Sequence, residues 1–305
     1  MSSLVPFGNI IFAFRRPTAY LGHVRELVAT GVCAAIYPFS VGVSIEDPGD
    51  PHRPVLIRTS APVSTTPVLL VHGYGHNSSG WIFLHRHLKK AGFERVFSMD
   101  YGPLCHDIPA QARALARRVE LIRVTTGADR VHLVGHSLGG ILIRYYVQLL
   151  GGDERVETAI TVASPHEGTL AAHMGLGTTI PQLQPGSWVV EALRDTARRT
   201  RVRWVAYYSN LDLLVQPTTS AMLRQPALGA TNVLVQDHGH LSLLLSPAVG
   251  RSIAHHLAVA DGLDTGPVDT DSVGPEPATA DLVMADGDSF SRPARLGPEL
   301  CVCRD

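Results

Sequence analysis

The sequence predicts an α/β fold, a mostly parallel sheet with helices on both faces. Short apolar runs that suit buried strands alternate with segments of helical periodicity from residue 67 onward, and this alternation is typical of a parallel sheet covered on two sides. The chain has 305 residues, of which 45% are hydrophobic, so it can bury a large core. Around residue 137, a glycine-flanked turn joins a strand-like run directly to a helix-forming run.

The expected elements follow in order along the chain. Because each is a short apolar run, strands are predicted at 68–71, 96–99, 131–134, 156–163, 204–208 and 233–235. Helices are predicted at 81–91, 138–150 and 247–258. One further amphipathic helix is predicted by apolar residues at spacings of four and three, namely Ile108, Ala112, Leu115, Val119 and Ile122. A short strand is also expected at 55–58.

Three parts are expected along the chain. Residues 1–46 form a hydrophobic N-terminal segment with a helix that ends near Tyr37, and residues 47–261 form the main domain. Residues 262–305 are predicted to be a disordered acidic tail, because ten acidic residues and three arginines lie between Asp261 and Asp305. The long apolar connection 165–203 is interpreted as a lid or cap insertion.

The N-terminal segment does not read as a secretion signal. Its apolar stretch 10–14 precedes Arg15 and Arg16, and no cleavage site follows in register. The uncharged run 27–45 approaches the roughly 20 residues of a spanning helix, but Pro38 should break a helix there. We expect this run to form a buried or cap helix, and a membrane-associated or spanning anchor is the alternative. The expected localisation is cytoplasmic or membrane-associated.

Charge and cysteine content narrow the function classes. The formal net charge is −1, which argues against a nucleic-acid binder, because phosphate neutralisation needs a basic excess or a basic face. Of the four cysteines, two lie two positions apart in the tail, so no disulfide framework is implied and a reducing setting is favoured.

The pattern Gly135-His136-Ser137-Leu138-Gly139 carries the strongest chemical signal. It follows the strand-like run VHLV and precedes a helix-forming run. A serine hydroxyl is a poor nucleophile unless a base removes its proton, and a tight strand-to-helix turn projects its oxygen out of the sheet. The flanking glycines are needed because side chains there would collide with neighbouring backbone. Ser137 is therefore predicted to be a nucleophile.

Four blocks carry a resemblance to a known family: VLLVHGYGHNSSGW, VHLVGHSLGG, TVASPHEGT, and YYSNLDLLVQP with DHGHLSLL. The chain from about residue 68 to 257 resembles the α/β-hydrolase superfamily, and more narrowly the small bacterial lipases and esterases of the Bacillus lipase kind. The resemblance implies an α/β-hydrolase fold and a carboxylic-ester hydrolase that forms an acyl-enzyme. This sequence departs from those secreted lipases in its insertion, its N-terminal segment and its lack of a secretion signal. An intracellular or membrane-associated esterase therefore fits the sequence as well as a secreted lipase does.

An acyl-transfer serine needs a base, and that base needs a carboxylate to fix its tautomer. In this superfamily the order along the chain is serine, acid, histidine. By resemblance, Asp212 matches the acid and His240 matches the histidine, with His238 as the competitor. Asp237 is too near the histidine in sequence to orient it.

The oxyanion that develops during acyl transfer needs two backbone donors. One is expected to be the amide of Leu138, directly after the nucleophile at the positive end of its helix. By resemblance, the other is the main-chain amide of Tyr74, with His72 as a structural residue of the same loop. His166 and Glu167 are expected to shape the floor of the site rather than to act as an acid, a base or a metal site.

The predicted substrate is an ester or lipid with an acyl chain, and no metal or organic cofactor is required. The same residues would also serve a thioesterase, an acyltransferase or an amidase. From a different class, a non-catalytic hydrolase-like binding protein remains an alternative. Membrane-surface association through the N-terminal segment is a further expectation, and the sequence makes no prediction of the oligomeric state.

Overall fold

The computed structural model describes residues 17–40, 64–101, 107–175, 177–263 and 273–275. Its centre is a seven-stranded sheet with the strand order β2-β1-β3-β4-β5-β6-β7. The strands are β1 (Val68–Val71), β2 (Val96–Met99), β3 (Val131–His136), β4 (Val156–Val162), β5 (Arg203–Ser209), β6 (Thr231–Val235) and β7 (Val273–Pro275). The first six run parallel, and β7 pairs antiparallel with β6 at the edge.

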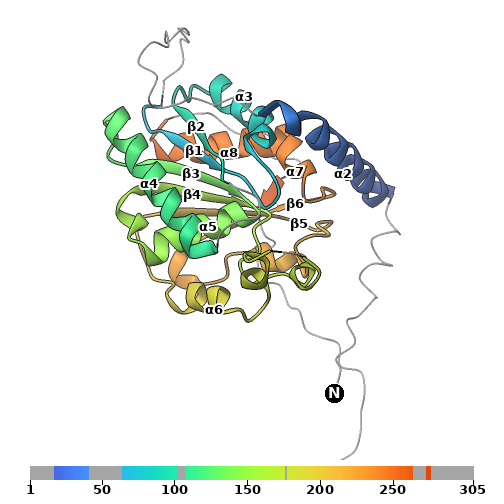
Figure 1. The fold of residues 1–305 in the computed structure, drawn as a ribbon. Coiled ribbons are helices and arrows are strands. Elements are labelled where there is room, and N and C mark those ends of the chain that lie inside the picture. Colours follow the sequence, from blue (N-terminus) through green and yellow to red (C-terminus); the bar gives the residue numbers. More distant parts are fainter. Residues whose placement is uncertain (1–16, 41–63, 102–106, 176, 264–272, 276–305) are drawn as a thin grey trace, which may run out of the picture.

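Helices cover both faces of this sheet (Figure 1). They are α2 (Pro17–Ile36), α3 (Ile82–Lys90), α4 (Ile108–Thr126), α5 (Leu138–Leu149), α6 (Trp188–Asp195), α7 (Ser242–Leu245) and α8 (Pro247–Ala260). One apolar core joins the sheet to α4, α5 and α6, and a second joins its other face to α3 and α8. In β1, Leu69 and Val71 enter the first core while Val68 and Leu70 enter the second, as the alternation of a strand requires.

The sequence around α4 shows why a helix forms there. Asp107 Oδ1 accepts a hydrogen bond from the amide of Ala110 at 2.8 Å, which caps the helix, and Pro109 follows in the first turn. The helix ends at Thr126, and the next residue, Gly127, has a φ of 69° that suits glycine. Its apolar residues at spacings of four and three are all buried, as the sequence predicts.

The predicted α/β-hydrolase fold is confirmed, with six parallel strands close to the expected ranges. The four-residue helix α7 was not foreseen. Within the tail 262–305, expected to be disordered, Val273–Pro275 instead forms β7. This strand needs only backbone hydrogen bonds to β6, and an edge position tolerates proline. The strand expected at 55–58 lies outside the described residues, and the boundaries 1–46, 47–261 and 262–305 stay predictions.

The connection 165–203 is folded over most of its length. It contains short 3-10 helices at Leu170–His173 and Ile180–Leu183, followed by α6. Gln182 Oε1 accepts a hydrogen bond from the amide of Ile108 at 2.8 Å, which ties the connection to the start of α4. Ile180, Leu183 and Leu193 are buried in the core on the α4 and α5 face.

The predicted N-terminal helix is present as α2 and ends at Ile36, followed by a 3-10 turn at Tyr37–Ser40. Figure 1 shows α2 beside α7, at the end of the sheet where the parallel strands finish. Among the described residues, no helix combines the length and the apolar character needed to cross a membrane.

Candidate active site

Ser137 lies on the turn between β3 and α5. Its φ of 53° and ψ of −121° are values that a residue with a side chain rarely adopts, and backbone strain of this kind is common at functional sites. The surroundings hold the turn in place: the Ser137 amide donates to the carbonyl of Val162 at 2.8 Å, and the Gly140 amide donates to the carbonyl of Ser137 at 3.1 Å. This is the geometry of a nucleophile elbow.

The two outer glycines of the pentapeptide allow the elbow to form. A Cβ atom on Gly139 would lie 2.1 Å from the carbonyl oxygen of Val71, and one on Gly135 would lie 2.6 Å from the carbonyl carbon of Gly139. Both positions therefore exclude any side chain, because α5 starts in direct contact with the neighbouring strand and with the end of β3.

The loops after β5 and β6 bring Asp212 and His240 together. His240 Nδ1 donates to Asp212 Oδ2 at 2.8 Å, and both side chains are buried. The other carboxylate oxygen of Asp212 accepts from the amides of Leu214 at 2.8 Å and Val215 at 2.9 Å. In all of these contacts the carboxylate oxygens accept, so the side chain of Asp212 is held in one orientation. The arrangement leaves Nε2 as the nitrogen of His240 that can accept a proton.

The pKa of His240 is raised above its ordinary value. Burial acts to lower it, but the charge of Asp212, its hydrogen bond and the charge of Glu26 together outweigh that effect. A carboxylate at hydrogen-bond distance favours the imidazolium form. The pair can therefore take up a proton and hold it while a reaction proceeds.

His136 connects the elbow to the histidine loop. Its Nε2 donates to the carbonyl of His240 at 3.1 Å, and the two rings lie with centroids 4.6 Å apart. Burial, followed by the charge of His240, holds the pKa of His136 well below its ordinary value. His136 is thus a neutral donor between the residue next to Ser137 and the backbone of His240, a role that sequence reasoning did not assign.

The structure pairs Asp212 with His240, whereas the alternatives His238 and Asp237 make other contacts. His238 Nδ1 lies 2.8 Å from the carbonyl of Gln236 in its own loop. The backbone amide of Asp237 donates to Asn210 Oδ1 at 2.8 Å, and Asp237 has a φ of 56°. Both residues belong to the turn that leads into His240.

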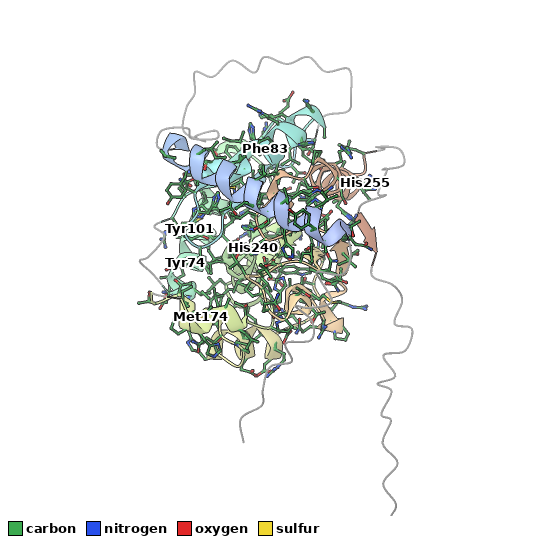
Figure 2. All side chains as sticks on the ribbon, turned by 90° about the vertical axis from the view of Figure 1, so that its right-hand side faces the viewer. Tyr74, Phe83, Tyr101, Met174, His240 and His255 are labelled. Carbon is green, nitrogen blue, oxygen red and sulfur yellow. The ribbon has the colours of Figure 1, made fainter. Side chains whose placement is uncertain are left out.

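The loop after β1 passes against Ser137. A Cβ atom on Gly73 would lie 3.0 Å from Ser137 Cβ, which places the half-buried Tyr74 next along the chain beside the elbow. Figure 2, seen from the side of α2, shows Tyr74, Tyr101 and His240 in this region. The loop can therefore present a backbone donor to an atom bound at Ser137.

His72 holds this loop and is not a base. Its ring stacks on Tyr101 with centroids 4.1 Å apart, its Nδ1 donates to the carbonyl of Gly73 at 2.8 Å, and its Nε2 accepts from the Tyr101 amide at 3.3 Å. Burial lowers its pKa to about 4, so the ring is neutral near pH 7. These contacts agree with the structural role expected for His72.

His166 and Glu167 also take structural positions. His166 is buried with Nε2 3.0 Å from Thr161 Oγ1, and burial holds its pKa well below the ordinary value. The Glu167 carboxylate accepts from Gln225 Nε2 at 2.7 Å. The buried guanidinium of Arg144 donates to the carbonyl of His166 at 3.1 Å and to Gln225 Oε1 at 2.9 Å, which completes a hydrogen-bonded network under the site.

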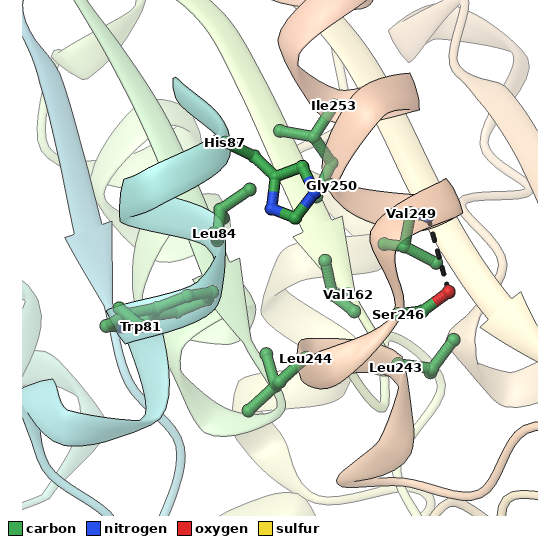
Figure 3. Close-up of a pocket in the computed structure, with 10 residues that line it drawn as sticks. All are labelled: Trp81, Leu84, His87, Val162, Leu243, Leu244, Ser246, Val249, Gly250 and Ile253. Atoms are coloured by element: carbon green, nitrogen blue, oxygen red, sulfur yellow. Dashed lines mark hydrogen bonds between the residues drawn. The ribbon is translucent and has the colours of Figure 1, made fainter. Parts of the chain in front are cut away.

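A small cavity lies between α3, α7 and α8 (Figure 3), and its lining includes none of Ser137, Asp212 and His240. It measures about 10 Å³, and apolar side chains such as Trp81, Leu84 and Ile253 line it. That volume is the least that holds one water molecule. The cavity is therefore a packing gap between the helices and not a substrate site.

Comparison with known proteins points to the same fold. Residues 66–183 match the family described as alpha/beta hydrolase fold. A triacylglycerol lipase of Pseudomonas fragi is 30% identical over 107 residues, covering 34% of this chain and 36% of the lipase. A triacylglycerol lipase of Pseudarthrobacter phenanthrenivorans is 28% identical over 110 residues, covering 34% of each. The chain thus spans about a third of the length of the curated relatives it matches.

Two solved lipases share the architecture. The mature form of a Bacillus licheniformis lipase superposes with a TM-score of 0.54 at 19% identity, covering 68% of this chain and 94% of the lipase. Lipase B of Aspergillus fumigatus superposes with a TM-score of 0.55 at 18% identity, covering 68% of this chain and 54% of that one. The chain therefore has the α/β-hydrolase fold and resembles bacterial lipases and esterases.

Proposed function

We propose that this chain is a serine hydrolase of carboxylic esters, with Ser137 as nucleophile, His240 as base and Asp212 as the residue that orients the base. One observation carries the proposal: His240 donates a buried 2.8 Å hydrogen bond to Asp212, and its carbonyl and ring contact His136, the residue directly before the strained Ser137. The lipase names of the relatives support the ester as substrate.

The reaction has two steps. Ser137 Oγ attacks the ester carbonyl while His240 Nε2 takes the hydroxyl proton, and His240 returns that proton to the alcohol as the C–O bond breaks. Water then attacks the acyl-enzyme, with His240 again taking and returning a proton, so that the carboxylic acid leaves and Ser137 is restored. The amides of Leu138 and Tyr74 stabilise the oxyanion in both steps.

Exposed apolar side chains near Asp212 support an acyl chain as part of the substrate. Leu213 and Leu214 follow Asp212 directly and are exposed, as is Leu170. The amide of Leu170 donates to the carbonyl of Gln216 at 2.9 Å, so the connection 165–203 lies against this loop. We place the acyl chain along this surface, with the connection acting as its cap.

The first experiment is the initial rate of hydrolysis of p-nitrophenyl esters from acetyl to palmitoyl, with Ser137→Ala as the blank. A Ser137-dependent rate that rises with acyl length supports a lipase, whereas a peak at short chains supports an esterase whose cap restricts size. No Ser137-dependent hydrolysis, together with no labelling of Ser137 by a fluorophosphonate, would overturn the proposal. Labelling without hydrolysis of oxyesters would point to thioesters or acyl transfer.

The outer face of α2 supports contact with a lipid surface. Tyr20, Leu21, Val24, Leu27 and Val28 are all exposed, and 74% of the Leu27 surface is accessible. A stripe of this kind at helical spacing gains free energy by entering a lipid interface. The double substitution Leu27→Ser and Val28→Ser should reduce co-sedimentation with phosphatidylcholine vesicles; unchanged sedimentation would remove this part of the proposal.

A further inference from the structure

The inner face of α2 lies on the loops that carry Asp212 and His240. Together with Glu26, small or buried residues form this face at spacings of three and four, namely Ala19, Gly22, Ala29 and Cys33. A Cβ atom on Gly22 would lie 2.4 Å from Leu211 Cδ1 and 2.9 Å from the carbonyl oxygen of Asp237. The helix backbone therefore contacts both the loop after β5 and the loop after β6.

Glu26 is the acidic residue in the middle of that face. Its Oε1 accepts from the amide of Leu241 at 2.9 Å, and its Oε2 accepts from the amide of Ser242 at 2.8 Å. These two amides follow His240 directly along the chain. They open the short helix α7, where amides have no acceptor within the helix itself, so a carboxylate 215 positions away in sequence takes that place.

The turn around His240 is closed from both sides. The amide of Gly239 donates to Ser242 Oγ at 2.8 Å, and a Cβ atom on Gly239 would lie 2.4 Å from Glu26 Oε2. His240 itself is held through its ring by Asp212 and through its carbonyl by His136. Glu26 thus supplies the third contact that sets the backbone, and with it the direction of the imidazole.

We propose that Glu26 is a positioning residue for His240: its carboxylate fixes the turn 239–242 and so sets the direction of the imidazole. This inference rests on the proposed function. The charged and titratable side chains that face His240 are Asp212 from the β5 loop, His136 from β3 and Glu26 from α2. Glu26 raises the pKa of His240 in addition to the larger effect of Asp212. The N-terminal helix therefore supports the turn that carries His240 in the proposed site.

The test is Glu26→Gln in the full-length chain, with Glu154→Gln as the matched control. Glu154 is exposed in the turn before β4, at the opposite end of the sheet, so the control removes the same charge far from His240. We expect Glu26→Gln to lower kcat on p-nitrophenyl butyrate by about tenfold with little change in KM, because charge-assisted hydrogen bonds to two amides are lost. Its kcat/KM profile should move to lower pH, since removing the negative charge lowers the pKa of His240.

Glu26→Asp separates charge from placement. It keeps the carboxylate on a shorter side chain, so the pH profile should return toward that of the wild-type protein while kcat stays reduced. Equal kcat and equal pH profiles in Glu26→Gln and Glu154→Gln would overturn the proposal. Thermal unfolding of each variant shows whether a lower kcat comes from loss of the fold; if Glu26→Gln does not fold, the comparison is made on Glu26→Asp.

NMR titration of His240, assigned through His240→Ala, keeps this inference separate from the proposed function. A His240 midpoint that is lower in Glu26→Gln than in Glu154→Gln supports the contact even if the wild-type chain hydrolyses no ester, in which case only the proposed function fails. An unchanged midpoint shows that Glu26 does not act on His240, whatever the activity.

Discussion

Two buried histidine–aspartate pairs lie at opposite ends of the same sheet. At the carboxyl end, His240 Nδ1 lies 2.8 Å from Asp212 Oδ2. At the amino end, His132 Nε2 on β3 lies 3.0 Å from Asp261 Oδ1, just after α8. By residue type, distance and burial of the histidine the two pairs are alike. They differ in what surrounds them.

The carboxylate of Asp212 is bound by amides of its own loop, and its partner His240 contacts His136, the residue directly before the strained Ser137. The carboxylate of Asp261 accepts instead from the hydroxyls of Ser64 and Thr66, the latter at 2.8 Å, and ties together three distant segments. A histidine–aspartate pair therefore does not indicate catalysis on its own. The strained serine turn that adjoins the pair, at the loop-bearing end of the parallel strands, distinguishes the proposed site from a structural tie.

The largest difference is expected when each aspartate is replaced by asparagine. Asp212→Asn should lower kcat by about 10⁴, because an amide neither fixes the required histidine tautomer nor stabilises the imidazolium. Asp261→Asn should leave kcat within about threefold, since it changes only a distant tie. Parallel ester-hydrolysis assays on the two variants measure this, and similar losses in both would erase the distinction between the pairs.

A second prediction concerns the close packing around the elbow at the carboxyl end of the sheet. Gly139→Ala places a methyl group 2.1 Å from the carbonyl oxygen of Val71, and overlap with backbone should lower the free energy of unfolding by about 3 kcal/mol or more. Gly31→Ala in α2 meets no atom within 4 Å and should raise it by about 0.5–1 kcal/mol. Urea unfolding compares the two. A tolerated Gly139→Ala would show that the elbow is less constrained than described.

The amino-end pair should contribute to stability in a pH-dependent way. The pKa of Asp261 is lowered: burial acts to raise it, but the hydrogen bond and charge of His132, together with the hydrogen bonds from Ser64 and Thr66, outweigh that effect. Its contribution is therefore present above the ordinary aspartate pKa and is lost as the pH falls through the lowered value. Asp261→Asn should cost about 1–3 kcal/mol at neutral pH. The cost, measured by urea unfolding, should shrink on acidification; a constant cost would argue against an ionised Asp261.

The smallest effect is expected in the pH profile of the wild-type protein. Neutral His240 is the proposed base, so kcat/KM should rise with pH through its pKa, with a midpoint above the ordinary value of about 6.5. The same raised pKa means that the stability gained from protonated His240 is present at low pH and lost as the pH rises through it. His132→Gln should leave the midpoint unchanged, and a wild-type midpoint below 6.5 would contradict the pairing.

Much of the fold was predictable because strands and long helices leave local patterns. The strands from β1 to β6 are apolar runs, and α4 shows its spacing of buried residues directly. The helix α7 has four residues, too few for a period to show. The strand β7 reads Val-Gly-Pro and forms because the edge of β6 offers backbone partners.

In the candidate site, too, the sequence predicts some residues and only the fold shows others. The sequence pattern alone predicts Ser137, because an elbow needs small residues at fixed offsets within one turn. Resemblance favours His240 over His238, and only the fold shows which of the two rings is hydrogen-bonded to Asp212.

The order of strands and helices, the place of the nucleophile and the two faces of each strand follow from sequence patterns over a few residues, since sterics and burial act locally. The contact between Glu26 and the turn after His240 joins residues 215 positions apart, and that between Asp261 and His132 joins residues 129 apart. Such contacts leave no local signature. Packing alone determines them, because a carboxylate binds whichever donors the folded backbone brings within reach.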